Sequence, residues 1–256
     1  MNKVYGIEKA SLLKRFSAFL LDVIVTLIVA TGVMALTSVI TKYDDYSDKM
    51  EALYTQYEEE YDIKFEMSIE EYEKMTEEEI KKYEEVYEVF SKDEEVIFTY
   101  NMVFNLTLLI VTLGCLFGVL ITEFIIPLIL KNGQTVGKKV FNLCLVKNNG
   151  VKINTMMLFV RSFLGKFTIE TMIPAYIVIL VVFGNAGAIG SIVLILILLI
   201  QIVLVFKTEN KCLIHDLMAG TVVVDKSSQM IFESEEALIE FKQEFYKKEA
   251  ESKKYF

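Results

Sequence analysis

The sequence predicts an all-α membrane protein with four transmembrane helices, an external helical hairpin inserted between the first two, and a small cytoplasmic β element. Hydrophobic residues make up 54% of the 256 residues, and the chain has two prolines. Its apolar runs are longer than the core of a soluble domain requires. Acidic and basic residues are also sorted into different segments between these runs, as they are in polytopic membrane proteins.

The apolar runs define the spans. The first two are each interrupted by one carboxylate, Asp22 and Glu123. The last run, residues 167–206, is too long for one crossing, because about twenty residues suffice. The glycine-rich stretch Gly184 to Gly190 divides it and predicts a turn. Four spans are therefore expected, at residues 16–40, 98–130, 167–184 and 185–206.

Charge orients the segments that join the spans. Residues 1–15 carry four basic residues and one acidic residue, and residues 131–166 carry seven basic residues and no acidic one. Residues 41–97 carry 21 acidic and seven basic residues. By the positive-inside rule, the two basic segments are cytoplasmic and the acidic segment is external. Four spans then place both termini in the cytoplasm, together with residues 207–226 and the tail at residues 227–256.

The acidic segment is expected to fold as an antiparallel helical hairpin. Capping boxes at Ser68 with Glu71 and at Thr76 with Glu79 predict two helix starts. Before them, apolar and aromatic residues recur at spacings of three and four, which predicts a helix that continues outward from the first span. We interpret this stripe as the seam of the hairpin or, alternatively, as a docking face for a protein partner. Its residues are Tyr43, Tyr46, Met50, Leu53, Tyr57 and Tyr61.

The basic segment after the second span combines a turn signal with a helix start. The Asn-Asn-Gly sequence at residues 148–150, with apolar runs on both sides, predicts a β-hairpin. The β-branched run Thr221 to Val224 is expected to add a strand to it. Asn154 or Thr155 should cap an amphipathic interfacial helix that ends near Lys166.

The loop at Gly133, Thr135, Gly137 and Lys138 imitates a phosphate loop. A phosphate loop, however, has four residues between its glycines and a hydroxyl residue after its lysine. Here three residues intervene, and Lys139 follows. Nucleotide binding is therefore not expected. Backbone turning and contact of the lysines with inner-leaflet phosphates explain these residues instead.

Ionisable residues within or beside the spans form the candidate site. Asp22 and Glu123 should lie about 10 Å from the inner ends of their helices, and Glu170 nearer the surface. Such groups are costly in a membrane unless they are paired or hydrated. Two interpretations stay open. In the first, an ion pair of Arg15 with Asp22 or of Arg161 with Glu123 holds the bundle together. In the second, the carboxylates form a cation or proton site.

His215, the single histidine of the chain, adjoins Asp216 after the fourth span. Asp216 is expected to cap a helix and is a second candidate partner for Arg15, whereas His215 is expected at the membrane interface. The histidine has neither a nucleophile motif nor a second metal ligand beside it. The sequence therefore predicts no enzyme activity, cofactor or metal site, and its three cysteines match no disulfide framework.

Three blocks, taken together, resemble the RDD family of polytopic bacterial membrane proteins. They are Arg15 to Asp22, Gly133 to Lys139, and His215 to Val224. The resemblance implies that Arg15, Asp22 and Asp216 are the arginine and the two aspartates for which the family is named. It also implies a bacterial cell membrane and suggests transport. The insertion from Tyr43 to Val96 is not part of the typical family core.

Two functions remain open at this stage. One is movement of a cation or small solute through an inner-leaflet cavity lined by Asp22, Glu123 and Glu170, which in so thin a bundle would require a homo-oligomer or a partner. The other is a non-transporting membrane adaptor or regulator that binds a protein through the acidic hairpin or through the amphipathic tail. The lipid bilayer is an expected partner in both. Nucleic acid is excluded, because the chain lies in a membrane and carries a net charge of −9.

Overall fold

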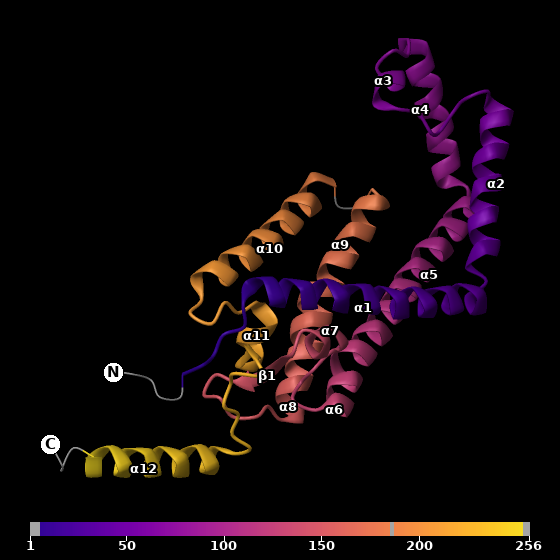
Figure 1. Ribbon diagram of the computed structural model, residues 1–256. Helices are drawn as coiled ribbons and strands as arrows, with labels where there is room; N and C mark the ends of the chain where they lie inside the picture. Colours follow the sequence, from indigo (N-terminus) through magenta and orange to yellow (C-terminus); the bar gives the residue numbers. More distant parts are fainter. Residues whose placement is uncertain (1–5, 185–186, 253–256) are drawn as a thin grey trace. The chain divides into compact units, whose positions relative to one another are not determined.

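The computed structural model describes residues 6–184 and 187–252, and helices dominate it (Figure 1). Within these residues, four helical stretches are long and apolar enough to cross a membrane, and a two-stranded sheet accompanies them. The predicted helical fold, with four apolar helices and a small sheet, is therefore confirmed. Asn185 and Ala186, in the predicted turn between the last two spans, lie outside the described residues. The four stretches are Leu12–Thr41, Glu94–Leu130, Thr155–Val182 and Gly187–Lys207.

The second and third spans each contain a π-helical segment. The second consists of α5 (Glu94–Val119), η1 (Leu120–Ile125) and α6 (Ile126–Leu130), and the third of α8 (Thr155–Phe159), η2 (Val160–Met172) and α9 (Ile173–Val182). The two prolines of the chain, Pro127 and Pro174, each lie two residues after one of these segments. Proline removes a helical hydrogen bond and crowds the preceding turn, and local π-helical geometry accommodates it. The same irregular segments carry Glu123, Arg161 and Glu170.

The helix that contains the third span begins earlier than the sequence predicts. An interfacial helix ending near Lys166 and a separate span from residue 167 are expected, whereas one continuous helix runs from Thr155 to Val182. Asn154 caps it by accepting a hydrogen bond from the Met157 N–H at 2.8 Å. Gly165 does not break the helix. It lies inside η2, where a side chain would collide with His215, so packing explains this glycine.

The described chain divides into two compact units, and residues 33–113 form one of them. This unit contains α2 (Tyr43–Tyr61), α3 (Ile69–Tyr72) and α4 (Glu77–Lys92). Both predicted capping boxes are present. The Ser68 hydroxyl accepts from the Glu71 N–H at 3.2 Å, and the Thr76 hydroxyl accepts from the Glu79 N–H at 3.3 Å. Each glutamate accepts in turn from the backbone of its capping residue, which fixes where α3 and α4 begin.

The aromatic stripe packs inside this hairpin, as the seam interpretation requires. Met50, Leu53 and Tyr57 of α2 share one buried cluster with Val86 and Phe90 of α4. The expectation that this helix continues the first span is wrong. α1 (Leu12–Thr41) and α2 are separated by Lys42, whose φ of 54° is left-handed and interrupts the helix.

The second unit contains the remaining residues and a small antiparallel sheet. β1 (Leu143–Lys147) pairs with β2 (Thr221–Asp225) in a register from Leu143 opposite Asp225 to Lys147 opposite Thr221. The predicted β-hairpin across residues 148–150 is therefore corrected. Lys152 makes only an isolated bridge to Val146. β2, and not the segment after the turn, is the main partner of β1. The valines of β2 offer a full-length run of β-branched side chains, and Val222 and Val224 are completely buried.

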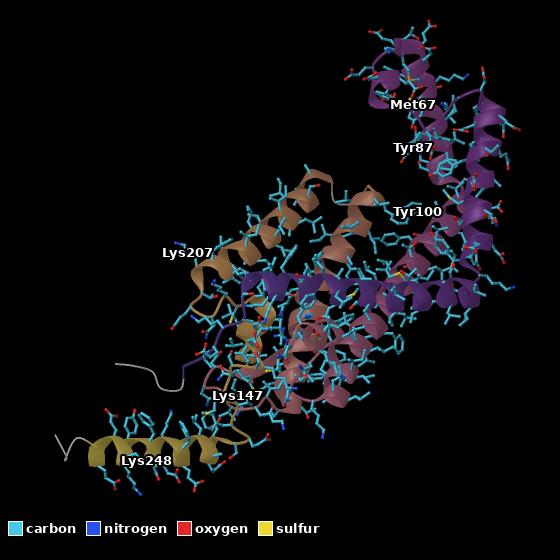
Figure 2. The ribbon with its side chains drawn as sticks, in the orientation of Figure 1. Met67, Tyr87, Tyr100, Lys147, Lys207 and Lys248 are labelled. Atoms are coloured by element: carbon cyan, nitrogen blue, oxygen red, sulfur yellow. The ribbon has the colours of Figure 1, made fainter. Side chains whose placement is uncertain are left out.

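Three helices of the second unit lie outside the spans. They are α7 (Val136–Val140), α11 (Ile214–Ala219), which follows α10 (Gly187–Lys207), and α12 (Glu235–Ser252). α7 packs on β1, while α11 packs on η2 and on β2. The amphipathic tail becomes α12, whose Leu238 and Phe241 pack with Val151 and Phe232. Figure 2 shows its side chains, with Lys248 labelled. The first turns of the tail thus dock on the unit.

Candidate functional site

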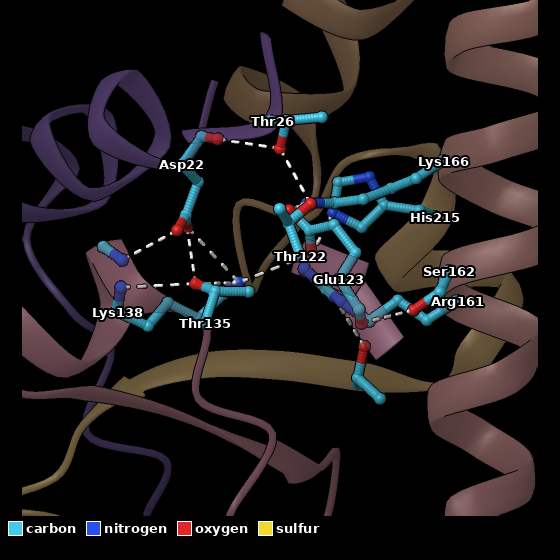
Figure 3. Close-up of polar contacts among 12 residues, drawn as sticks. Asp22, Thr26, Thr122, Glu123, Thr135, Lys138, Arg161, Ser162, Lys166 and His215 are labelled. Atoms are coloured by element: carbon cyan, nitrogen blue, oxygen red, sulfur yellow. Dashed lines mark hydrogen bonds and ion pairs between the residues drawn. The ribbon is translucent and has the colours of Figure 1, made fainter. Parts of the chain in front are cut away.

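Two groups of buried or partly buried charged and polar residues lie where the spans meet α7 and α11. We call the first the Lys138 cluster, which comprises Asp22, Glu123, Thr135, Lys138 and Lys166. We call the second the Arg161 cluster, which comprises Arg15, Arg161, Glu170, His215 and Asp216. Figure 3 draws the contacts among most of them. Asp22, Glu123, Lys138, Arg161 and Asp216 are each at most 6% exposed.

Asp22 of α1 binds the start of α7. Its Oδ2 accepts a hydrogen bond from the Thr135 hydroxyl at 2.5 Å, and its Oδ1 accepts from the Gly137 N–H at 2.7 Å. The Lys138 ammonium lies 3.9 Å from Oδ2. A carboxylate at this position satisfies donors that the short helix leaves free at its first turn. The side chain of the first span therefore holds the loop of residues 131–140 in place.

Gly137 permits this contact. A Cβ atom built on Gly137 would lie 2.2 Å from the carbonyl oxygen of Ala18 and 2.9 Å from the Asp22 carboxylate. Only glycine lets the loop backbone approach α1 so closely. Thr135 fixes the neighbouring turn by accepting a hydrogen bond from the Lys138 N–H at 3.3 Å. The glycines that imitate a phosphate loop thus serve contact with the protein's own carboxylate.

Glu123 of η1 shares Lys138 with Asp22. Its carboxylate is ion-paired with Lys166 of η2, and its Oε2 lies 3.9 Å from the Lys138 ammonium. The hypothesis of an Arg161–Glu123 ion pair is wrong, because Arg161 pairs elsewhere. The expected contact of Lys138 with lipid phosphates is wrong as well, because its side chain is only 8% exposed and lies between the two carboxylates.

Burial and the neighbouring charges change the proton affinity of Lys138. Burial disfavours its charged form, Glu123 and Asp22 favour it, and the result is a pKa lowered to about 8. Hydroxyl groups surround the same region. The hydroxyls of Thr26 in α1 and Thr122 in η1 lie 2.8 Å apart, and Thr26 also donates to the Asp22 backbone carbonyl at 2.8 Å. Around Lys138 itself lie oxygen atoms of three chain segments, from Asp22, Glu123 and Thr135.

The Arg161 cluster joins the third span to α11. Arg161 is ion-paired with Asp216 and donates to the Thr221 hydroxyl at 3.2 Å. Arg15 lies 3.7 Å from the other Asp216 oxygen. Of the two partners proposed for Arg15, Asp216 is therefore the one found. A pair with Asp22 does not form, because donors of the α7 loop already bind both Asp22 oxygens.

His215 lies within the cluster and is only 4% exposed. Its Nδ1 lies 2.7 Å from a Glu170 carboxylate oxygen, and its Nε2 lies 2.9 Å from an Arg161 guanidinium nitrogen. The expectation that Asp216 caps a helix agrees with its acceptance of a hydrogen bond from the Leu213 N–H at 3.4 Å. Burial raises the pKa of Asp216, but the Arg161 guanidinium outweighs it and holds that pKa well below its ordinary value.

The structure brings the predicted carboxylates together only in part. Asp22 and Glu123 meet through Lys138, whereas Glu170 belongs to the Arg161 cluster. Sequence reasoning missed Lys166 as a partner of Glu123, although its position in a span that also carries Arg161 is a usable signal. It also missed the hydroxyls of Thr26, Thr122 and Thr221. A threonine within or beside an apolar run is only a weak signal of such a contact.

The charges of the two clusters balance. Four cations, Arg15, Lys138, Arg161 and Lys166, face four carboxylates, Asp22, Glu123, Glu170 and Asp216. Each carboxylate has a cation or a histidine as partner, so burial of these groups is compensated. Binding of a cation beside these carboxylates is therefore favoured when one of the protein's own cations moves away or loses a proton.

A model of the RDD family matches residues 9–220, a range that contains both clusters and the acidic hairpin. No curated protein and no solved structure matches the chain.

Proposed function

The chain belongs to the RDD family, and from this premise we propose that it moves a small monovalent cation across a membrane in exchange for a proton. Asp22 and Glu123 are the carboxylates that bind the cation, and Lys138 is the group that loses its proton when the cation binds. The observation that carries the proposal is the position of the Lys138 ammonium, 3.9 Å from each carboxylate.

An ammonium between two buried carboxylates occupies the place of a bound cation. If Lys138 gives up its proton, Asp22 and Glu123 together carry two negative charges against one remaining partner, Lys166. A monovalent cation restores the balance, so one proton leaves for each cation that enters. The pKa of Lys138, lowered by burial to about 8, supports this exchange because deprotonation then takes place near neutral pH.

The surrounding oxygen atoms suit a hard cation. Such ions prefer carboxylate, carbonyl and hydroxyl oxygens. The Thr135 hydroxyl contacts Asp22 directly. Thr26 follows Asp22 by one helical turn, Thr122 precedes Glu123 by one residue, and their hydroxyls lie 2.8 Å apart. Four spans are few for a transport pathway, and we expect a homo-oligomer to complete it.

Flux in proteoliposomes tests the proposal. Asp22→Asn and Glu123→Gln should abolish cation-driven proton flux, because the amides keep the shape of the side chains but lose their charge. Lys138→Gln should uncouple cation from proton movement. Glu235→Gln is the matched control, since Glu235 is an exposed partner of Lys147, and it should transport like the wild type. Wild-type flux in folded Asp22→Asn protein would exclude these carboxylates as the site.

The orientation that accompanies this function places both termini and the sheet in the cytoplasm of a bacterial cell and the acidic hairpin outside. The charge asymmetry of the connecting segments supports it. In a cysteine-free variant, a cysteine at Glu59 should react with an impermeant reagent in intact cells, and one at Asn149 only after permeabilisation. Equal labelling of the two sites would contradict this topology.

A second candidate is a non-transporting adaptor that binds a protein through the acidic hairpin. Exposed apolar side chains on α4 favour it, because Tyr87 is 53% and Val89 49% exposed on a helix whose other face is already packed. Replacing residues 43–96 with a short Gly/Ser linker should then abolish partner recovery while the remaining spans fold. Full cation flux in the same variant would instead assign the core activity to the spans.

A further inference from the structure

We propose that His215 is a proton-operated latch whose neutral form holds α11 on the third span and whose protonated form loosens that contact. The inference does not depend on transport. It rests on the geometry of the two ring nitrogens and on the close packing of α11 against η2.

The neighbours of the ring define its protonation state. The Arg161 guanidinium can only donate hydrogen bonds, so His215 Nε2, 2.9 Å away, must accept and carries no proton. Nδ1 lies 2.7 and 2.9 Å from the two oxygens of the Glu170 carboxylate, which accepts, so Nδ1 carries the proton. The structure therefore assigns the neutral Nδ1–H tautomer. Burial, assisted by Arg161, lowers the pKa of His215 and agrees with this assignment.

The histidine also holds the backbone of α11 in place. The His215 N–H donates to the Glu170 carboxylate at 3.2 Å, and a Cβ atom built on Gly165 would lie 2.4 Å from the His215 Cβ. α11 thus contacts η2 through the His215 ring, through the His215 backbone, and through the close approach of His215 to Gly165. Glu170, Arg161 and Gly165 all belong to η2, so one side chain connects α11 to three positions of the third span.

Protonation of His215 removes one of these connections. A proton on Nε2 would face the Arg161 guanidinium, so a donor would oppose a donor and a cation a cation. The attraction to Glu170 and to the Asp216 carboxylate, 3.6 Å from Nε2, would remain. Arg15, from α1, also faces Asp216, and Gln201, from α10, contacts both Glu170 and the α11 backbone. The protonated ring would move toward Glu170 and away from Arg161.

Nitrogen NMR of the full-length protein in nanodiscs tests the tautomer. His215 is the only histidine of the chain, so uniformly ¹⁵N-labelled protein without a histidine tag gives one imidazole. At pH 7.5 we expect a protonated Nδ1 and an unprotonated Nε2, and titration at a pKa below the ordinary value of 6.5. An Nε2–H tautomer, or an imidazolium at pH 7.5, would overturn the proposal. Glu170→Gln should keep the tautomer, because its amide oxygen still accepts, and lower the pKa further.

Hydrogen exchange tests the latch itself. After correction for intrinsic rates, amides of residues 214–219 should exchange faster as the pH falls from the ordinary histidine value of 6.5 towards the lowered pKa of His215. Over this range the opening constant should rise by up to about tenfold per pH unit for one coupled proton, and it should level off below the lowered pKa. His215→Gln retains a donor and an acceptor but cannot titrate, so its exchange should not respond in this way. Amides of β1 serve as an internal control. Equal acid response of α11 in wild type and His215→Gln would disprove the latch.

Discussion

The acidic hairpin buries aromatic rings and leaves its charges in solvent, whereas the junction of the spans with α7 and α11 buries charges. In the hairpin, Phe90 stacks on Tyr54 and packs edge to face with Tyr57, and ion pairs such as Lys92 with Glu88 stay exposed. At the junction, the buried contacts are ion pairs. Arg161 pairs with Asp216, and Lys138 lies between the carboxylates of Asp22 and Glu123.

The difference follows from what each region must specify. An aromatic core is stabilising wherever water surrounds it, and it tolerates small shifts of its members. A buried charge is stabilising only when its partner lies at the right distance, so a charged junction favours one arrangement. Loss of either partner then lowers the stability of the fold. The hairpin therefore has a buried core of its own, and the junction is a region whose geometry can depend on protons or ions.

Removal of one buried cation should give the largest effect. Arg161→Ala leaves Asp216 without its closest cation, and we expect a loss of about 3–5 kcal/mol in the free energy of unfolding. Lys92→Ala, which removes an exposed cation from the hairpin, should cost less than about 1 kcal/mol. Thermal unfolding of both variants in the same detergent measures the difference. Equal losses of unfolding free energy would contradict the view that charges contribute more to stability at the junction than in the hairpin.

Crowding the loop contact should have an intermediate effect. Gly137→Ala forces a methyl group against the Ala18 carbonyl oxygen and the Asp22 carboxylate, so we expect a destabilisation of about 1–3 kcal/mol. Gly32→Ala is the matched control, because nothing lies within 4 Å of its added Cβ and alanine favours a helix. Denaturation curves should therefore move in opposite directions for the two variants. A neutral Gly137→Ala would show that the loop can retreat from α1.

Loss of a hydrogen bond within the hairpin should have a smaller effect than either junction variant. Tyr57→Phe removes the bond to Asp93, 2.9 Å long, and should cost about 0.5–1.5 kcal/mol. Burial first, and Asp93 second, raise the pKa of Tyr57 from 10.0 to about 12. Because this folded-state pKa lies above the unfolded one, the contribution is complete below pH 10 and is lost as the pH rises towards 12. Hairpin unfolding in this range should be less pH-dependent in the Phe variant.

Local patterns were sufficient for the elements of the hairpin and for the number of spans. The capping boxes at Ser68 and Thr76 depend on residues three positions apart, and the apolar runs depend on length alone. Both signals are complete within a short stretch of sequence, so neighbouring elements do not alter them. The seam of the hairpin also follows from spacing, because residues that share a helical face meet the same partner.

Only the tertiary structure decided how the charges pair. Arg15 and Asp22 share a face of α1 and invite a local pair, yet Asp22 binds the α7 loop and Arg15 turns to Asp216. The sheet likewise joins β1 to a strand more than seventy residues later, and not to the residues after its own Asn-Gly turn. Sequence by itself determined how many helices are long and apolar enough to cross a membrane, because hydrophobicity acts on each segment alone. Charge partners were decided by folding, because a buried ion takes whichever counter-charge the packing of distant segments brings within a few ångströms of it.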